Sequence, residues 1–348
     1  MRSPLNPGRP FRLVSTVAVL GLAAMATPAV SSASSHKVED VRAKLVRGTL
    51  EVKGGPQGNA VALRLGDRTQ VQVDVGDDGS ADFSFARSDL RAINVSMGNG
   101  DDAVRIDDTN GAFTDSIPTT IAGGAGDDSL IGGAGAETFY GGAGNDTIDG
   151  GKGNDSVDGG RGTDTASLGD GNDVFSWDPG EGSDVIDGQD GSDRMLFNGA
   201  AGADTVTMTA NFGRLTFFRN PGNITMDTDN VEIVDFNALG GPDSVTVNNL
   251  TDTDVTQTTL DLAATIGGSA GDGAIDNVVV NATKGDDTIN IDGSRAGVDV
   301  TGLASAVSIK HADPTDVLSL NSVAGKDSVS VNGVAGLLRL LIDGTPAA

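Results

Sequence analysis

Six consecutive segments read GGAGDDSLI (123–131), GGAGAETFY (132–140), GGAGNDTID (141–149), GGKGNDSVD (150–158), GGRGTDTAS (159–167) and LGDGNDVFS (168–176). The chain therefore repeats every nine residues in the pattern GGxGxDxUx, where U is apolar. The glycines allow a tight turn with exposed carbonyls, the acidic residue supplies a carboxylate, and the DxU tail starts a short strand. The pattern predicts a stack of short turns and short strands.

This nonapeptide resembles the repeats of the repeats-in-toxin (RTX), or hemolysin-type, calcium-binding family. The resemblance rests on acidic residues that fall nine apart, namely Asp128, Glu137, Asp146, Asp155, Asp164 and Asp173. It implies an all-β fold, a parallel β-roll or β-solenoid in which two nonapeptides make one coil. Turns of successive coils would stack on the same edge and hold Ca²⁺ ions between them.

The resemblance also implies two rows of acidic side chains, one along each edge. The expected rows are Asp128, Asp146 and Asp164 on one edge, and Glu137, Asp155 and Asp173 on the other. Neighbouring coils would lie about 4.8 Å apart. One hard cation could then take oxygen ligands from two turns at about 2.3 to 2.6 Å. The expected cofactor is several Ca²⁺ ions, shared between coils.

The register continues on both sides of the six segments with spacing faults. Asp184 follows Asp173 by eleven residues, which predicts a bulged coil, and Asp193 restores the spacing of nine. Asp102 lies in a similar setting upstream. The candidate metal ligands are therefore Asp102, Asp128, Glu137, Asp146, Asp155, Asp164, Asp173, Asp184 and Asp193. Asp204 and the later DxU segments at Asp243, Asp287, Asp316 and Asp327 have irregular spacing, and we expect that most of these later turns no longer bind metal.

Two segments depart from the pattern. The second has Ala136 and Glu137 where an acidic or amide residue followed by Asp is expected, and the longer side chain is expected to weaken or distort that site. The sixth has Leu168 in place of the first glycine and is followed by Trp177 and Pro179. These residues suggest that the chain changes direction locally.

Composition supports an acidic protein with a thin core. The chain has 51 Gly in 348 residues, about twice the usual share, and only 4% aromatic residues. Its formal net charge is -26, which opposes compaction unless counter-ions bind. Calcium would relieve this charge and couple metal binding to folding. The same charge argues against nucleic acid and anionic membranes as partners.

The first 33 residues have the features of a secretory signal peptide. Arg2, Arg9 and Arg12 precede an apolar run, and small residues follow at Ala29 and Ala33. An uncleaved membrane anchor is the alternative, but the apolar run is short for a span. The chain has no Cys, so calcium would serve in place of disulfides. We expect a secreted, extracellular protein with no membrane insertion after cleavage.

The rest of the chain divides by composition into a β-rich region at 34–97, the calcium-binding repeats at 98–207 and a degenerate β-solenoid region at 208–348. Period-two alternation in both flanks predicts strands, and it fits either further solenoid coils or a β-sandwich. The loop with Asp74, Asp78, Gly79 and Asp82 partly matches an EF-hand, but a hairpin turn is the simpler interpretation.

Catalysis finds little support, and we expect that the protein is not an enzyme. There are two histidines, His36 and His311, and no HExxH motif. The GxSxG match around Ser269 is easily met by chance in a glycine-rich chain. A polysaccharide-modifying enzyme stays as the less favoured alternative.

An extracellular adhesin or cell-surface matrix protein is the second alternative, with a cell-surface glycan or protein as partner. It would use the aromatic and basic residues Phe212, Arg214, Phe217, Phe218 and Arg219. Burial of these aromatic side chains, and of Trp177, is the preferred interpretation. The predicted activity is therefore calcium binding, with calcium-dependent folding outside the cell.

Overall fold

The tails of the nonapeptides form short strands that pair in parallel with the tails of the next coil. Phe139 of β10 (Glu137–Ala143) lies opposite Val157 of β12 (Ser156–Arg161), and Ile148 of β11 (Thr147–Asp149) lies opposite Ala166 of β13 (Thr165–Gly171). Each partner is two nonapeptides further along the chain. The prediction that two repeats make one coil is therefore confirmed.

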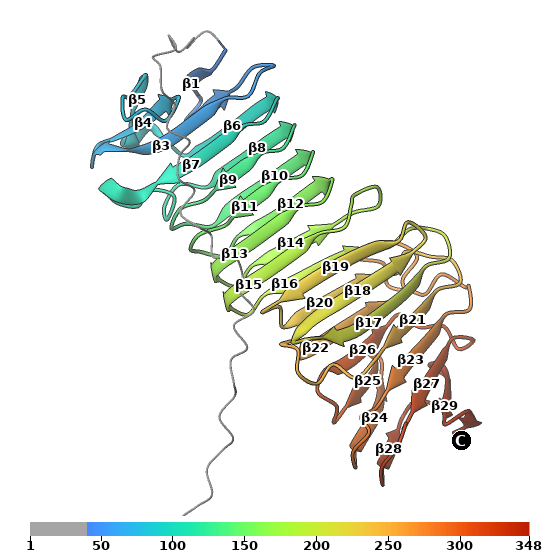
Figure 1. The fold of residues 1–348 in the computed structure, drawn as a ribbon. Helices are drawn as coiled ribbons and strands as arrows, with labels where there is room; N and C mark the ends of the chain where they lie inside the picture. Colours follow the sequence, from blue (N-terminus) through green and yellow to red (C-terminus); the bar gives the residue numbers. More distant parts are fainter. Residues whose placement is uncertain (1–39, 348) are drawn as a thin grey trace, which may run out of the picture. The chain divides into compact units, whose positions relative to one another are not determined.

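The computed structural model describes residues 40–347, so the predicted signal peptide and His36 lie outside the described residues. The described chain forms two largely parallel sheets and two short 3₁₀ helices, η1 (Arg87–Asp89) and η2 (Asp108–Asn110), with no α-helix (Figure 1). Within this range, no helix has the length and apolar character needed to cross a membrane.

The first sheet has fourteen strands. In spatial order they are β1 (Arg42–Val46), β2 (Thr49–Lys53), β6 (Ala92–Asn99), β8 (Thr119–Ala125), β10, β12, β14 (Val174–Trp177), β16 (Arg194–Asn198), β20 (Ile233–Asn237), β22 (Gln257–Asp261), β26 (Ala306–Lys310), β25 (Gly297–Thr301), β24 (Thr288–Ser294) and β28 (Ser328–Asn332).

The second sheet has sixteen strands. In spatial order they are β30 (Thr345–Pro346), β29 (Arg339–Ile342), β27 (Val317–Asn321), β23 (Asn277–Asn281), β21 (Ser244–Val247), β17 (Thr205–Asn211), β18 (Arg214–Asn220), β19 (Ile224–Asp229), β15 (Val185–Gly191), β13, β11, β9 (Ser129–Ile131), β7 (Ala103–Asp107), β3 (Ala60–Asp67), β4 (Gln70–Val75) and β5 (Phe83–Ala86).

The coils after the sixth nonapeptide are longer, as their spacing predicted. Ala166 pairs with Ile186 across β13 and β15, and Phe175 pairs with Met195 across β14 and β16. The matching acidic residues in these coils are 20 residues apart, against 18 in the regular coils. The strand pairing stays parallel, so the extra residues lie in the turns.

Both flanks extend the same two sheets. Antiparallel hairpins are inserted at β3–β4–β5, at β17–β18–β19 and at β24–β25–β26, and parallel pairing resumes beside them. For example, β19 pairs in parallel with β15, and β17 pairs in parallel with β21. The strands β6 and β17 run across residues 97–98 and 207–208. The flanks are therefore coils of the solenoid and are not separate sandwiches.

The core is one layer of apolar side chains between the two sheets. The U positions of the six nonapeptides supply this layer, with every side chain almost completely buried: Leu130, Phe139, Ile148, Val157, Ala166 and Phe175. Leu168, which replaces a glycine, is also fully buried in this layer. Because side chains alternate in direction along a strand, most of the strands give the core only one or two residues, whereas β3, β4 and β6 give three or more.

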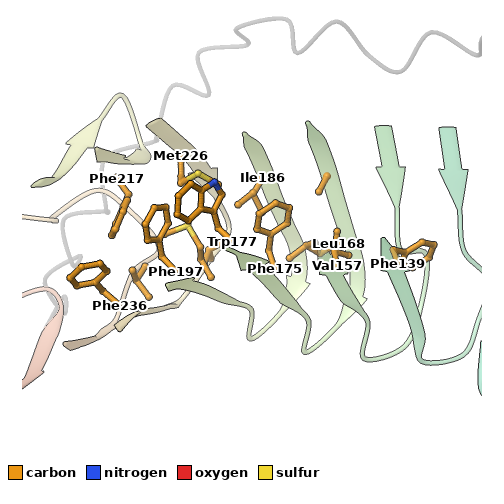
Figure 2. Close-up of a cluster of buried hydrophobic side chains, with 14 of the residues drawn as sticks. Phe139, Val157, Leu168, Phe175, Trp177, Ile186, Phe197, Phe217, Met226 and Phe236 are labelled. Atoms are coloured by element: carbon orange, nitrogen blue, oxygen red, sulfur yellow. The ribbon is translucent and has the colours of Figure 1, made fainter. Parts of the chain in front are cut away.

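An aromatic cluster fills the coils that follow the regular repeats (Figure 2). The rings of Trp177 and Phe197 stack with centroids 4.0 Å apart, and Phe217 and Phe236 pack beside them. Trp177 also donates a hydrogen bond from Nε1 to the carbonyl of Gly182 at 2.7 Å. The preferred interpretation, that these aromatic side chains are buried, is confirmed for Trp177 and Phe217, but it is wrong for Phe212, which lies at a turn and is fully exposed.

We expect Phe197→Ala to lower the free energy of unfolding by about 3–5 kcal/mol, because a fully buried ring in contact with three others leaves a cavity. Phe212→Ala is the matched control, since Phe212 is fully exposed. Urea unfolding at a fixed calcium concentration measures both. Equal midpoints for the two variants would contradict this role for the cluster.

Candidate metal centre

The acidic residue of each repeat lies just before its strand and ties one coil to the next. The backbone N–H of Asp128 donates to Oδ1 of Asp146 at 2.8 Å, and that of Asp146 donates to Oδ1 of Asp164 at 2.8 Å. The row continues at both ends. The N–H of Asp102 donates to Oδ1 of Asp128 at 2.7 Å, and the N–H of Asp164 donates to Oδ1 of Asp184 at 2.9 Å. Five of the nine predicted ligands therefore form one continuous row.

The other four form the second row. The backbone N–H of Glu137 donates to Oδ1 of Asp155 at 2.7 Å, that of Asp155 to Asp173 at 2.6 Å, and that of Asp173 to Asp193 at 2.8 Å. Asp193 then donates to Oε2 of Glu232 at 2.7 Å. The two rows match those implied by the RTX resemblance. Glu232 was missed because it lies outside any DxU segment.

The second carboxylate oxygen has no partner in any of these residues. All nine predicted ligands are at least 98% buried, and each has one side-chain oxygen that is buried without a hydrogen bond. An ionised carboxylate in such a place costs several kcal/mol unless a positive charge or another donor compensates it. We call each carboxylate of a row, with its contact to the next coil, a rung. At each rung a bound proton or a bound cation would compensate the unpaired oxygen.

Burial raises the pKa values of these carboxyl groups. Desolvation is the main cause, and it raises the pKa of Asp146 to about 7, of Asp155 to about 8 and of Asp184 and Asp193 to about 7. Neighbouring carboxylates raise these values further, and the backbone N–H donors partly oppose the shift. At neutral pH the ionised form therefore needs a bound cation, which would lower the pKa again.

The first glycine of a repeat makes room for the unpaired oxygen. A Cβ atom on Gly150 would lie 2.7 Å from Oδ2 of Asp155, and one on Gly159 would lie 2.5 Å from Oδ2 of Asp164. A side chain at either position would collide with the carboxylate. At Gly150 and Gly159 the absence of a side chain thus allows the carboxylate to lie close to its own turn, whereas the sixth segment accommodates Leu168 at the same position.

The residue before each acidic ligand builds a second, exposed ladder. The N–H of Asn145 donates to Oδ1 of Asp127 at 2.7 Å, and the N–H of Thr163 donates to Oδ1 of Asn145 at 2.9 Å. This ladder explains the preference for Asp or Asn at this position, which the sequence showed without giving its cause.

In the second segment Ala136 takes this position, and Glu137 itself bends back so that its Oε2 accepts from the N–H of Gly133 at 2.9 Å. Its other oxygen stays without a partner, like those of its neighbours.

The donor chemistry of the turns fits calcium. No three His, Cys, Asp or Glu side chains converge into a metal site within residues 40–347. Each coil-to-coil contact instead offers one carboxylate oxygen beside a glycine turn. Carboxylate and carbonyl oxygens are the ligands that Ca²⁺ takes, whereas zinc and other softer metals prefer His and Cys.

A comparison with protein families agrees with this geometry. The model of the RTX calcium-binding nonapeptide repeat (4 copies) matches residues 119–148, 140–175 and 180–206. The chain thus contains RTX calcium-binding repeats, and their stacked Asp turns indicate Ca²⁺ binding. No curated protein matches the chain.

Asp204 has the same place in its coil but no free oxygen. Arg219, from the inserted strand β18, lies 2.7 Å from Oδ1 of Asp204 and is almost completely buried with it. The other oxygen accepts from the N–H of Ala200 at 2.8 Å. The guanidinium of Arg219 also lies over the ring of Trp177, 5.6 Å from its centroid. A side chain of the protein therefore supplies the positive charge at this rung.

The other candidate sites from the sequence are explained by local structure. Asp74 pairs with Arg64 at 2.6 Å and accepts from the N–H of Gly79 at 2.8 Å, so the loop with EF-hand character is a hairpin turn between β4 and β5. Ser269 and His311 line the same surface pocket, but no hydrogen bond connects their side chains in the described structure, and His311 pairs with Asp261 instead.

The aromatic and basic residues between 212 and 219 do not form one surface patch. Phe217 and Arg219 are buried, and Arg214 pairs with Asp227 and Asp229 at 2.6 and 3.0 Å. Phe212 alone among these residues is fully exposed, at the turn between β17 and β18. The structure thus uses most of this set for internal contacts.

We expect Arg219→Met to lower the free energy of unfolding by about 3–5 kcal/mol, because it leaves a buried, unpaired carboxylate at Asp204. Urea unfolding at a fixed calcium concentration measures the loss. The double variant Arg219→Met/Asp204→Leu should recover much of it, and Arg68→Met, at an exposed position, is the control. If the single variant were as stable as this control, Arg219 would not compensate Asp204.

Proposed function

We propose that this protein is a secreted calcium-binding β-roll whose repeat region folds when calcium binds. The observation that carries the proposal is the pair of carboxylate rows, in which all nine residues have a buried oxygen without a partner. Nine buried carboxylates cannot all stay ionised in two closely spaced rows unless cations compensate their charge. Calcium would supply positive charge and oxygen coordination at these rungs, so binding and folding would be one process.

The composition of the chain supports action outside the cell. The segment 1–33 has the features of a signal peptide, and the absence of Cys excludes disulfides as the stabilising cross-links. Extracellular calcium-binding modules have dissociation constants of about 10⁻⁴ to 10⁻³ M, so they are loaded outside the cell and empty at cytosolic calcium levels. The chain would then stay unfolded until export.

Binding, rather than catalysis, is the activity that we assign. His311, Arg214 and Arg219, which could have served an enzyme or an adhesin, each pair with an acidic residue of the protein. A turnover assay with acidic polysaccharides and a binding assay with cell-wall glycans test the two alternatives directly. Activity in the first assay would overturn our assignment of the chain as a non-enzyme.

Calcium added to the chelated protein should cause a cooperative gain of β-sheet signal in far-ultraviolet circular dichroism, and magnesium should not. Asp146→Asn and Asp155→Asn each remove one charged ligand, so each should raise the calcium midpoint about tenfold. Asp252→Asn, at an exposed acidic residue of a distant loop, is the control. A chelated chain that already has its full β signal would refute calcium-dependent folding.

The calcium-free protein should become more structured as the pH falls from 8 to 5. In the folded state burial raises the pKa values of Asp146 and Asp155 to about 7 and about 8, above their unfolded values. The folded state therefore binds more protons in this range, and its stability is lost as the pH rises through the folded pKa values. Circular dichroism in chelator at pH 5 and pH 8 measures the effect.

Saturating calcium should flatten this pH dependence, because a cation then replaces the protons. A calcium-free chain with more structure at pH 8 than at pH 5 would contradict the assignment of the buried carboxyl groups.

A further inference from the structure

A third row of carboxylates lies beyond the repeats. The backbone N–H of Asp204 donates to Oδ1 of Asp243 at 2.7 Å, that of Asp243 to Asp276 at 2.8 Å, and that of Asp276 to Asp316 at 3.0 Å. The coil-to-coil contact is the same as in the two rows of the repeats. Only Asp204 of this row lies within the residues that the RTX family model matches.

The rungs of this third row differ in how their charge is compensated. Asp204 is paired with Arg219. At Asp316 the second oxygen accepts from the N–H of Asp313 at 2.6 Å. Asp243 is 99% buried, and its Oδ2 has no partner. This one rung has the same unpaired oxygen as the nine residues of the repeats.

The surroundings of Asp243 are acidic and contain no basic partner. Asp272, on the next turn, accepts from the N–H of Gly241 at 2.6 Å, and a Cβ atom on Gly240 would lie 3.4 Å from its Oδ2. The acidic neighbours of Asp243 are Asp276 and Asp272 on one side and Asp204, which is paired with Arg219, on the other. Within the described residues no Lys or Arg forms an ion pair with Asp243, Asp272 or Asp276. Burial and charge therefore both favour a bound cation at this turn.

Glycine also shapes this turn. Gly240 and Gly241 have φ values of +111° and +102°, which side chains rarely adopt. The Cβ position of Gly241 would lie 2.8 Å from the backbone of Gly202 in the preceding coil. The turn thus keeps the close coil-to-coil approach of the repeats although its spacing has changed.

We propose that the turn 240–243 holds a further calcium ion, bound by Asp243 and facing Asp272 of the adjacent turn. This site lies outside the matched repeats, and it rests on the proposed calcium-binding function. It differs from the repeat sites because a side-chain carboxylate, Asp272, takes part from the adjacent turn. The sequence alone favoured loss of metal binding in most of these later turns.

Counting bound calcium tests the site. Equilibrium dialysis of the full chain at saturating calcium gives the number of ions per chain, and circular dichroism shows that each variant is folded. Asp243→Asn and Asp272→Asn should each lose about one ion relative to the unchanged chain. Asp252→Asn, an exposed acidic residue in the same half of the chain, should lose none. Asp272→Asn decides the question if Asp243→Asn does not fold, since Asp272 is only half-buried.

Asp146→Asn distinguishes a failure of the further site at 240–243 from a failure of calcium binding by the repeats. If Asp146→Asn lowers the count but both Asp243→Asn and Asp272→Asn keep it, the site at 240–243 is wrong and the function of the repeats stands. If the unchanged chain binds no calcium, the proposed function itself fails. Loss of ions from both sets of variants supports the further site.

Discussion

One side chain per repeat both joins the coils and creates the need for a cation. Oδ1 of each aspartate in the two rows accepts the backbone N–H of the preceding coil, at 2.8 Å for Asp128 and Asp146, whereas Glu137 accepts from its own turn. The same geometry buries Oδ2 without a donor. The carboxylate cannot be removed without losing the contact between coils, and it cannot stay ionised without a positive charge. On the proposed function, folding and cation binding would therefore depend on the same atoms.

The chain solves this constraint in different ways along its length. In the nonapeptide coils the unpaired oxygens remain available. At Asp204 the guanidinium of Arg219 supplies the charge, and in the N-terminal hairpin Arg64 does the same for Asp74. Both arginines lie on antiparallel strands beside the carboxylate that they pair with. An arginine on an antiparallel hairpin can thus take the place of a bound metal ion. Its guanidinium supplies the positive charge that the buried carboxylate needs.

The sequence predicted the parts of the structure that repeat locally. The spacing of nine carried the resemblance to RTX repeats, and this resemblance implied the coil length and the two rows, because glycine turns and DxU tails each act within one segment. The nine candidate ligands include Asp102 and Asp184, which depart from this spacing. The third row was not predicted, since its rungs are 39, 33 and 40 residues apart and are brought together only by long-range strand pairing around inserted hairpins. The pairing of Arg219 with Asp204 was missed for the same reason, because it depends on the pairing of β17 with β18; the sequence had placed Arg219 in a surface patch only under the less favoured adhesin alternative.

The thin core makes the carboxylate rows more important than they would be in a globular domain. Most strands of the repeats give the core only one or two apolar side chains, and a coil contacts only its two neighbours, so stability is built from coil-to-coil contacts. In the repeats every such contact includes a buried carboxylate. On the proposed function, a cation bound at one rung would stabilise both coils that share it. The second of these coils would then hold the carboxylate of the next rung in place. Cooperative folding of the repeats would then follow from the shared ligands, and the aromatic cluster around Phe197 would add apolar packing to the coils that contain Asp173 and Asp193.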